Sequence, residues 1–377
     1  MRILQVVTLV SPDGAYGGPA RVALNQSAGL RQSGTEALVA AATRGYRTIP
    51  SDIAGVPVQL FRSRTIVPGI GFAGLGAPGL YRWFSRHRAE FDLVHIHFGR
   101  DLVVLPIAAA ARRHRIVYAL QTHGMVEPSD HPLARPLDSM WTRKVLRGAG
   151  AVFYLTPSER DRLVAVGGDD LRLTHLHNGV PSCPRGTTMP PPTSDARDPE
   201  VLFAARLHPR KGATIFVKMA RMLLDTGVQA RFTLVGPDQG EGRAVREAIG
   251  AEHRVVWEGP LDSSEMTARM ASASVFVLPS VREPYPMAVL EAMSVGLPVV
   301  VSDDCGLAAT VARGGCGLVA APTVEAMADA VRALLADQRL ARESGERGRS
   351  IANAEFGMDG VVATLSATYS DLVGARL

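Results

Sequence analysis

The chain has 377 residues, of which 46% are hydrophobic and 20% charged, and its formal net charge is +5. Single hydrophobic cores stop growing at about 250–300 residues, so this length predicts two domains, and the composition excludes a largely disordered chain. The three cysteines, Cys183, Cys305 and Cys316, form no CxxC pair, which argues against a disulfide framework or a zinc site. The longest apolar run, 102–111, is shorter than the roughly 18 residues that span a bilayer, and the N-terminal run makes a poor signal peptide. We therefore expect a soluble, cytoplasmic protein.

Short apolar runs alternate with helical patterns along the first half of the chain. Continuous apolar strands that alternate with helices are typical of a parallel sheet covered on both faces. The runs that predict buried strands are 3–10, 36–42, 92–98, 115–122 and 151–155, and the helical patterns are 20–32, 79–90 and 133–147.

The alternation stops at residues 181–200, which are rich in Pro, Ser, Thr and Asp and read as a linker. It then restarts with strands at 201–206, 231–236, 254–259, 274–280 and 297–302, and helices at 211–225, 241–250, 264–272 and 286–295. An amphipathic helical pattern, 358–372, ends the chain. The predicted fold is α/β, with two Rossmann-like, doubly wound domains at 1–183 and 184–357, followed by a C-terminal helix at 358–377. Such sheets bind ligands at the carboxyl ends of their strands.

The most specific motif is a pair of glutamates, Glu283 and Glu291, separated by seven residues after the strand at 274–280. Glu283 lies in the loop, Pro286 suits the first helical turn, and Glu291 follows in the second turn. One glutamate can reach sugar hydroxyls and the other a ribose, while the helix N-terminus offers amides to a phosphate. The alternative is an ordinary helix with a capping glutamate and a solvated one.

A second motif, Arg206-Leu-His-Pro-Arg-Lys211-Gly, follows the first strand of the second half. Fixed positive charges in a loop before a helix can clamp a diphosphate, although a solvated turn would have a similar composition. After the first strand of the chain, Gly17 and Gly18 precede Pro19 and would let a ligand approach the backbone, but a plain tight turn fits almost as well.

Histidines gather at the predicted strand ends. No cluster of Cys, Asp or Glu completes a metal set around them, so we expect no bound metal. His123, followed by a glycine at the end of a central strand, is the best candidate for a residue at a reacting sugar. The histidines are His95, His97, His123, His175 and His177.

With these motifs in this order, nearly the whole chain resembles the retaining glycosyltransferases of the GT-B fold, specifically glycosyltransferase family 4. The resemblance implies a UDP- or GDP-sugar donor, a carbohydrate or lipid-linked acceptor, a central cleft between the domains, and a C-terminal helix that crosses back to the first domain. It implies no cofactor, because Arg, Lys and a helix terminus replace the cation. No nucleic-acid partner is expected.

The resemblance also assigns roles to individual residues. His123 would lie by the transferred sugar, and Gly18, beside Gly17, would offer its amide to the donor phosphate. Arg206 and Lys211 would bind the diphosphate. The remaining roles fall in the second half: Glu283 for sugar hydroxyls, Glu291 for the ribose, the amides of Met287 and Ala288 for phosphate or sugar, and Leu261 near the base.

Two departures from the family pattern bear on donor identity. Tyr285-Pro286 stand where many members have Phe-Gly, and proline has no amide to donate. Gly306-Leu-Ala-Ala309 replaces a Gly-x-Pro-Glu run. Two rival functions are a hydrolysing nucleotide-sugar epimerase, which would need acid and base groups at the sugar, and a non-catalytic two-domain receptor.

The first half of the chain is basic. Residues 1–183 hold 21 Lys and Arg against 13 Asp and Glu, a net of +8, and the remainder has a net of −3. Residues 62–88 combine five arginines with apolar and aromatic residues. This composition suits either an anionic membrane surface near a lipid-linked acceptor or an ordinary helix whose aromatic residues pack inward. Association with the inner face of the membrane is therefore a second expectation for localisation.

Overall fold

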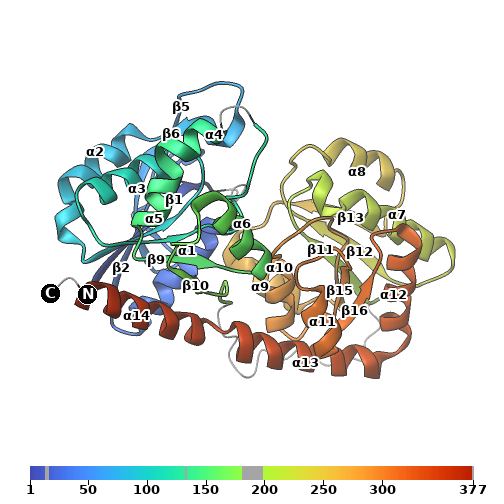
Figure 1. The fold of residues 1–377 in the computed structure, drawn as a ribbon. Coiled ribbons are helices and arrows are strands. Elements are labelled where there is room, and N and C mark those ends of the chain that lie inside the picture. Colours follow the sequence, from blue (N-terminus) through green and yellow to red (C-terminus); the bar gives the residue numbers. More distant parts are fainter. Residues whose placement is uncertain (13–16, 132–133, 181–197, 376–377) are drawn as a thin grey trace. The chain divides into compact units, whose positions relative to one another are not determined.

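The computed structural model describes residues 1–12, 17–131, 134–180 and 198–375, and the chain divides into two compact units (Figure 1). Unit 1 comprises Met1–Gly179 and Met358–Leu377, and unit 2 comprises Val180–Gly357. The predicted boundary between residues 183 and 184 and most of the predicted linker, 181–197, lie outside the described residues.

Unit 1 is built on an eight-stranded sheet in the order β10-β9-β8-β7-β1-β2-β4-β3, in which only the β3–β4 pair is antiparallel among the described strands. The five predicted strands are confirmed as β1, β2, β7, β8 and β9. The strands of the sheet are β1 Arg2–Val10, β2 Glu36–Thr43, β3 Asp52–Ile53, β4 Val56–Arg62, β7 Leu93–His97, β8 Tyr118–Gln121, β9 Ala151–Tyr154 and β10 Leu173–His175.

The predicted helices of unit 1 are also confirmed, with one irregularity. The helix expected at 133–147 contains a π-helical turn, Asp138–Thr142, between two short α-helical pieces. A small hairpin, β5 Arg64–Thr65 with β6 Leu75–Gly76, precedes α2. The α-helices are α1 Gly17–Gln32, α2 Pro78–His87, α3 Val104–Arg113, α4 Ala134–Leu137, α5 Arg143–Gly148, α6 Pro157–Gly167 and α14 Met358–Gly374.

The C-terminal helix α14 packs within unit 1, although unit 2 separates it from the rest of that unit in sequence. Its apolar residues, among them Val362, Leu365 and Tyr369, are buried in one cluster with residues of β1, α1 and β9. A Cβ on Gly29 of α1 would lie 2.6 Å from Val362, so glycine allows the close approach of the two helices. Buried apolar contact therefore holds α14 on unit 1.

Unit 2 contains a parallel six-stranded sheet in the order β13-β12-β11-β14-β15-β16. The five predicted strands are confirmed and β16 is added at one edge. The strands are β11 Glu200–Ala204, β12 Arg231–Val235, β13 Val255–Gly259, β14 Val275–Leu278, β15 Val299–Ser302 and β16 Gly317–Ala320. The helices are α7 Ala213–Asp225, α8 Gly242–Ile249, α9 Ser263–Ala271, α10 Met287–Ser294, α11 Ala308–Gly314, α12 Val324–Ala336 and α13 Gln338–Phe356.

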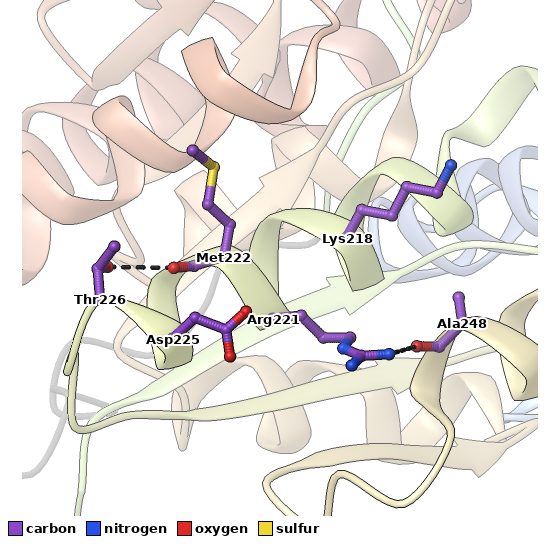
Figure 2. Close-up of a pocket in the computed structure, with 6 residues that line it drawn as sticks. All are labelled: Lys218, Arg221, Met222, Asp225, Thr226 and Ala248. Carbon is purple, nitrogen blue, oxygen red and sulfur yellow. Dashed lines mark hydrogen bonds between the residues drawn. The ribbon is translucent and has the colours of Figure 1, made fainter.

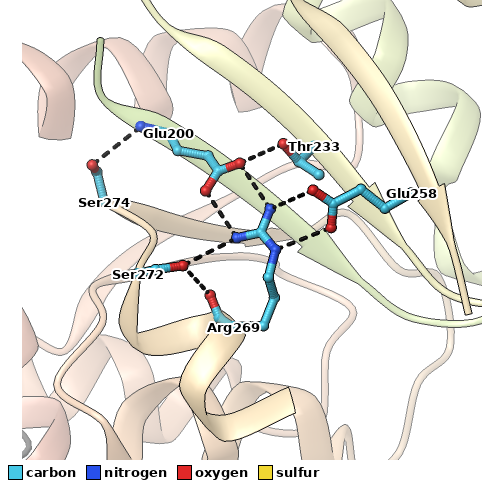
Figure 3. A network of polar contacts seen from close by, with 6 residues as sticks. All are labelled: Glu200, Thr233, Glu258, Arg269, Ser272 and Ser274. Atoms are coloured by element: carbon cyan, nitrogen blue, oxygen red, sulfur yellow. Dashed lines mark hydrogen bonds and ion pairs between the residues drawn. The ribbon is translucent and has the colours of Figure 1, made fainter. Parts of the chain in front are cut away.

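One guanidinium ties three elements of unit 2 together (Figure 3). Arg269 of α9 donates two 2.8 Å hydrogen bonds to Glu200 of β11, and its Nε lies 3.0 Å from Glu258 of β13. Burial alone would raise the pKa of Glu200, but the hydrogen bonds from Arg269 and Thr233 outweigh it and lower that pKa. The network fixes α9 against the sheet.

Each sheet has a point where the chain reverses its direction of winding. In unit 1 the reversal falls between β1 and β7, and in unit 2 between β11 and β14, because each first strand has later strands on both sides. Loops from the carboxyl ends of such a pair diverge and leave a crevice for a ligand. Within the part of the chain that the structure describes, no helix is both long and apolar enough to span a bilayer.

Candidate functional site

In unit 2, the loops after β11 and β14 carry the charged residues singled out by the sequence. Lys211 Nζ and Glu283 Oε2 lie 2.5 Å apart, although 72 residues separate them in sequence, and their side chains are only 15% and 14% exposed. The two loops are packed tightly: a Cβ on Gly212 would lie 2.2 Å from the carbonyl oxygen of Pro279. The fold thus joins the two sequence motifs at the point of reversed winding.

Arg206 lies in the same loop as Lys211 and is held from a third loop. Its Nη1 donates a 2.8 Å hydrogen bond to Oε1 of Gln239, which follows β12. The backbone beneath is crowded, since a Cβ on Gly236 would lie 2.0 Å from the carbonyl oxygen of Ala205. Gln239 belongs to no sequence motif, and its role depends on a tertiary contact with Arg206.

The glutamate loop is supported from below by Gly306. The amide of Gly306 donates a 2.8 Å hydrogen bond to the carbonyl oxygen of Glu283. A Cβ at this position would lie 1.9 Å from the carbonyl oxygen of Pro284, a distance that no side chain can tolerate. The sequence marked Gly306 only as part of a departure from a family pattern, whereas the structure makes it a support of the Glu283 loop.

Helix α10 begins directly after this loop. Pro286 is its N-cap rather than a residue of its first turn, and the amide of Val289 already bonds to the carbonyl oxygen of Pro286. Met287 and Ala288, both half-buried, supply the first two amides of the helix, which by position have no intrahelical acceptor. Glu291 lies in the second turn, as predicted, and the structure buries it. Leu261 is half-buried in the loop after β13, at the same carboxyl edge of the sheet.

The remaining predicted site residues belong to unit 1. Gly17 and Gly18 begin α1, and Gly18 is exposed. A Cβ on Gly18 would meet no atom within 4 Å, so packing does not require glycine there. Open space therefore lies beside Gly18 at the first turn of α1.

His123 follows β8 with a backbone φ of +50°, in the left-handed region that a residue with a Cβ rarely adopts. Its Nε2 lies 2.7 Å from Nδ1 of His97, and Nε2 of His97 lies 2.6 Å from Oε1 of Gln5. With Gln5 so oriented, Nε2 of His97 must donate, and Nδ1 of His97 then accepts from His123. The chain of contacts therefore leaves Nδ1 of His123 as an acceptor.

The two histidine pairs singled out in the sequence lie in different environments. His95 and His97 are both buried in β7, with rings nearly parallel and 4.9 Å apart, and His95 contacts the hydroxyl of Tyr369. His175 is exposed at the end of β10. Among the described residues, no three His, Cys, Asp or Glu side chains are arranged to hold a metal ion.

Burial makes these histidines difficult to protonate. It lowers the pKa of His95 to about 3 and also lowers the pKa of His123, and burial together with the neighbouring His95 and His123 lowers that of His97. Burial raises the pKa of Asp101, which accepts a 2.8 Å hydrogen bond from Thr8, to about 6.

We therefore expect the chain to lose stability as the pH falls below about 6.5, the value at which histidines of the unfolded chain take up protons. Each buried histidine then lowers the free energy of unfolding by about 1.4 kcal/mol per pH unit, because it takes up a proton in the unfolded chain but not in the folded one. The raised pKa of Asp101 has the opposite sign below pH 6 and offsets one histidine. Thermal unfolding between about pH 7 and about pH 5 should show this slope, and His95→Gln should reduce it. An unchanged slope in His95→Gln would contradict the assignment.

A separate depression lies in unit 2 (Figure 2). It has a volume of about 470 Å³ and lies between the C-terminal half of α7 and α8, where Arg221 donates a 3.0 Å hydrogen bond to the carbonyl oxygen of Ala248. Since α7 starts after the carboxyl end of β11, its C-terminal half lies toward the opposite edge of the sheet. None of the predicted site residues is among its lining residues, which are Lys218, Arg221, Met222, Asp225, Thr226 and Ala248.

Comparison with known proteins places the chain among enzymes. Residues 17–179 match the family described as glycosyl transferase 4-like domain, and residues 185–351 match glycosyl transferases group 1. A GDP-mannose-dependent alpha-(1-6)-phosphatidylinositol monomannoside mannosyltransferase of Mycolicibacterium smegmatis is 30% identical over 298 residues, 73% of this chain and 76% of the relative. A 2-deoxystreptamine glucosyltransferase of Streptomyces kanamyceticus is 27% identical over 346 residues, 85% of this chain and 88% of the relative.

Solved structures share the fold. Sucrose-phosphate synthase from Thermosynechococcus elongatus has a TM-score of 0.75 at 20% identity, with both chains covered completely. The Anabaena protein Alr3699/HepE in complex with UDP and glucose has a TM-score of 0.74 at 20% identity, covering 97% of this chain and 99% of that one. With family matches in both units and a 30% identical relative, the chain belongs to the family 4, group 1 glycosyltransferases and is a glycosyltransferase with the GT-B fold.

Proposed function

We propose that this glycosyltransferase moves a sugar from a nucleoside diphosphate donor, a UDP- or GDP-sugar, to a hydroxyl acceptor with retention of the anomeric configuration. The observation that carries the proposal is the Lys211–Glu283 ion pair at the carboxyl ends of β11 and β14, with Arg206 in the same loop as Lys211. Among similar proteins, the Anabaena structure contains UDP and the mycobacterial relative is GDP-mannose-dependent by name.

The donor would lie against the described loops of unit 2. Arg206 and Lys211 would hold the diphosphate together with the amides of Met287 and Ala288, because two cations and a helix N-terminus can neutralise its charge. The same groups would stabilise the leaving nucleoside diphosphate, which supports a reaction that needs no metal ion. Glu283 would accept hydrogen bonds from sugar hydroxyls. The remaining contacts would be Glu291 to the ribose and Leu261 to the base.

In unit 1, His123 is proposed to contact the reacting sugar, and Gly18, beside Gly17, to offer its amide to a donor phosphate. The unprotonated Nδ1 of His123 would accept a hydrogen bond from a sugar hydroxyl. The lowered pKa of His123 supports contact and orientation rather than proton donation at neutral pH.

The proposed reaction is a front-face displacement. The bond between the anomeric carbon and the diphosphate oxygen breaks, and its electron pair leaves with the phosphate. The acceptor oxygen bonds to the same face of that carbon, and its proton passes to the departing phosphate oxygen. Catalysis then consists mainly of positioning and charge stabilisation.

The test is proton NMR of a donor incubated with the protein and EDTA, with and without an acceptor hydroxyl. Retention predicts that an α-linked donor such as UDP-glucose or GDP-mannose yields an α-linked product and nucleoside diphosphate, with only slow hydrolysis when the acceptor is absent. A β-linked product would refute retention. Rapid epimerisation without acceptor would favour the rival epimerase.

We further propose that unit 1 meets an anionic membrane surface, where a glycolipid or polysaccharide precursor would be its acceptor. Some apolar residues of the predicted patch, 62–88, belong to the hydrophobic core instead of the surface. Leu75 and Phe84 are buried, and Trp83 is half-buried. Four large apolar side chains remain exposed beside exposed arginines: Ile66 at 50%, Val67 at 39%, Ile70 at 39% and Tyr81 at 44%. Met140 and Trp141 of the π-helical turn are also exposed, next to Arg143 and Lys144.

Flotation with liposomes tests the membrane proposal. We expect binding to anionic but not neutral vesicles, weaker at high salt, since each cation near such a surface contributes about 1 kcal/mol. Ile66→Asp should weaken binding by removing an apolar contact. Val256→Asp, which changes an exposed apolar residue of unit 2 in the same way, should leave binding unchanged. Binding that ignores lipid charge, or is absent from anionic vesicles at low salt, would leave a soluble acceptor.

A further inference from the structure

The turn that carries His123 has a strained backbone. His123 has φ +50° and Gly124 has φ +73°, so two consecutive residues occupy the left-handed region. Glycine adopts it freely, but histidine does not. Such a conformation persists only when its surroundings hold it in place.

Glu159, from α6, holds this turn. Its Oε1 accepts a 2.6 Å hydrogen bond from the hydroxyl of Thr122 and another from the amide of Gly124, so it binds the residues on either side of His123. Its Oε2 accepts a 2.7 Å hydrogen bond from the amide of Leu155. The side chain is buried, and among the described residues it has no ion-pair partner. Two amides and a hydroxyl therefore hold the carboxylate in place.

Capping of α6 does not account for these contacts. Thr156 is the N-cap, and its hydroxyl accepts from the amide of Glu159 at 3.2 Å. In a capping box the third-residue glutamate would return to the amide of Thr156 itself. Here one carboxylate oxygen reaches instead across 35 residues of sequence to the turn after β8.

The ring of His123 is held separately from its backbone. His97 holds the ring at 2.7 Å, while Glu159 binds the side-chain hydroxyl of Thr122 before it and the backbone amide of Gly124 after it. Independent control of backbone and ring is what a preorganised contact residue requires.

We propose that Glu159 is the positioning residue of His123, which it holds in the conformation that meets the reacting sugar. The proposal rests on the role of His123 proposed above. Loss of the carboxylate should loosen the turn and lower kcat more than it raises KM, because misplacement of a reacting contact by about 1 Å can cost about 100-fold in rate.

The experiment compares three variants in the full-length protein with its best donor. Glu159→Gln should lower kcat by about 10- to 100-fold, and Thr122→Val, which removes one of the three contacts, by a smaller factor. Thr156→Ala is the matched control, since it weakens the same end of α6 without touching the turn, and should keep its kcat within about 3-fold while lowering Tm. Amide exchange at Gly124 should accelerate in Glu159→Gln but not in Thr156→Ala.

A double-mutant cycle separates positioning from general destabilisation. In the His123→Ala background, Glu159→Gln should cost little further activity, because the residue it positions is gone. An equal loss in both backgrounds, or a kcat for Thr156→Ala as low as that of Glu159→Gln, would overturn the proposal. If His123→Ala keeps full turnover, the role of His123 itself is wrong and this inference falls with it. If His123→Ala is impaired while Glu159→Gln and Thr122→Val are not, only the positioning role is wrong.

Discussion

Lys211→Ala and Arg206→Ala should each reduce turnover by about 10²–10³-fold, the range for removing one preorganised charge stabiliser. The effect should fall on kcat because negative charge on the diphosphate grows as the sugar leaves. Since Lys211 is paired with the largely buried Glu283, its removal also leaves that carboxylate without its cation. Lys211→Ala should therefore lose thermal stability as well as turnover.

Controls separate these effects. Lys218→Ala, an exposed lysine on α7, removes an equal charge from unit 2 and should keep full turnover. Glu291→Ala should raise the KM for the donor and leave kcat nearly unchanged, because a ribose contact is the same in the ground and transition states. EDTA should have no effect on the wild type, and abolition of activity by EDTA would implicate a metal. Full turnover in both Arg206→Ala and Lys211→Ala would show that neither residue contributes to the reaction.

Gly306→Ala should reduce turnover by about 100-fold without touching the donor. The new methyl group would lie 1.9 Å from the carbonyl oxygen of Pro284, so the loop that carries Glu283 must move. Gly348→Ala in α13 is the control, since its Cβ would find ordinary contacts at 3.5 Å or more. If both glycine variants retain wild-type kinetics, the loop does not need the geometry described above.

Sequence patterns predicted the central strands of each sheet but missed strands toward its edges. Buried central strands such as β1 and β14 are continuous apolar runs, which are easily recognised. The edge strand β16 is short and only half-buried, and β4 alternates buried and half-buried residues, so neither has that signal. Helix α3 overlaps the run 102–111, which is apolar throughout and so shows no helical stripe, and the charged helix α13 lacks a strong apolar stripe.

The site was predictable only as far as its motifs are local. Glu283 and Glu291 lie on one loop and helix, so spacing alone indicated their relation. The pairing of Lys211 with Glu283, by contrast, depends on β11 and β14 being neighbours in the sheet. The Thr-x-x-Glu pattern at 156–159 signals a helix start, but its contact with the His123 turn arises from tertiary packing.

Unit 2 is proposed to bind a nucleoside diphosphate through Arg206 and Lys211. Thermal unfolding with UDP, GDP and their sugars, in EDTA, tests it most directly. One nucleotide should stabilise the wild type by about 2.7 kcal/mol at 100 times its Kd. Arg206→Ala and Lys211→Ala should abolish most of this shift, whereas Lys218→Ala should retain it. No shift with any nucleoside diphosphate, or an equal shift in all the variants, would contradict it.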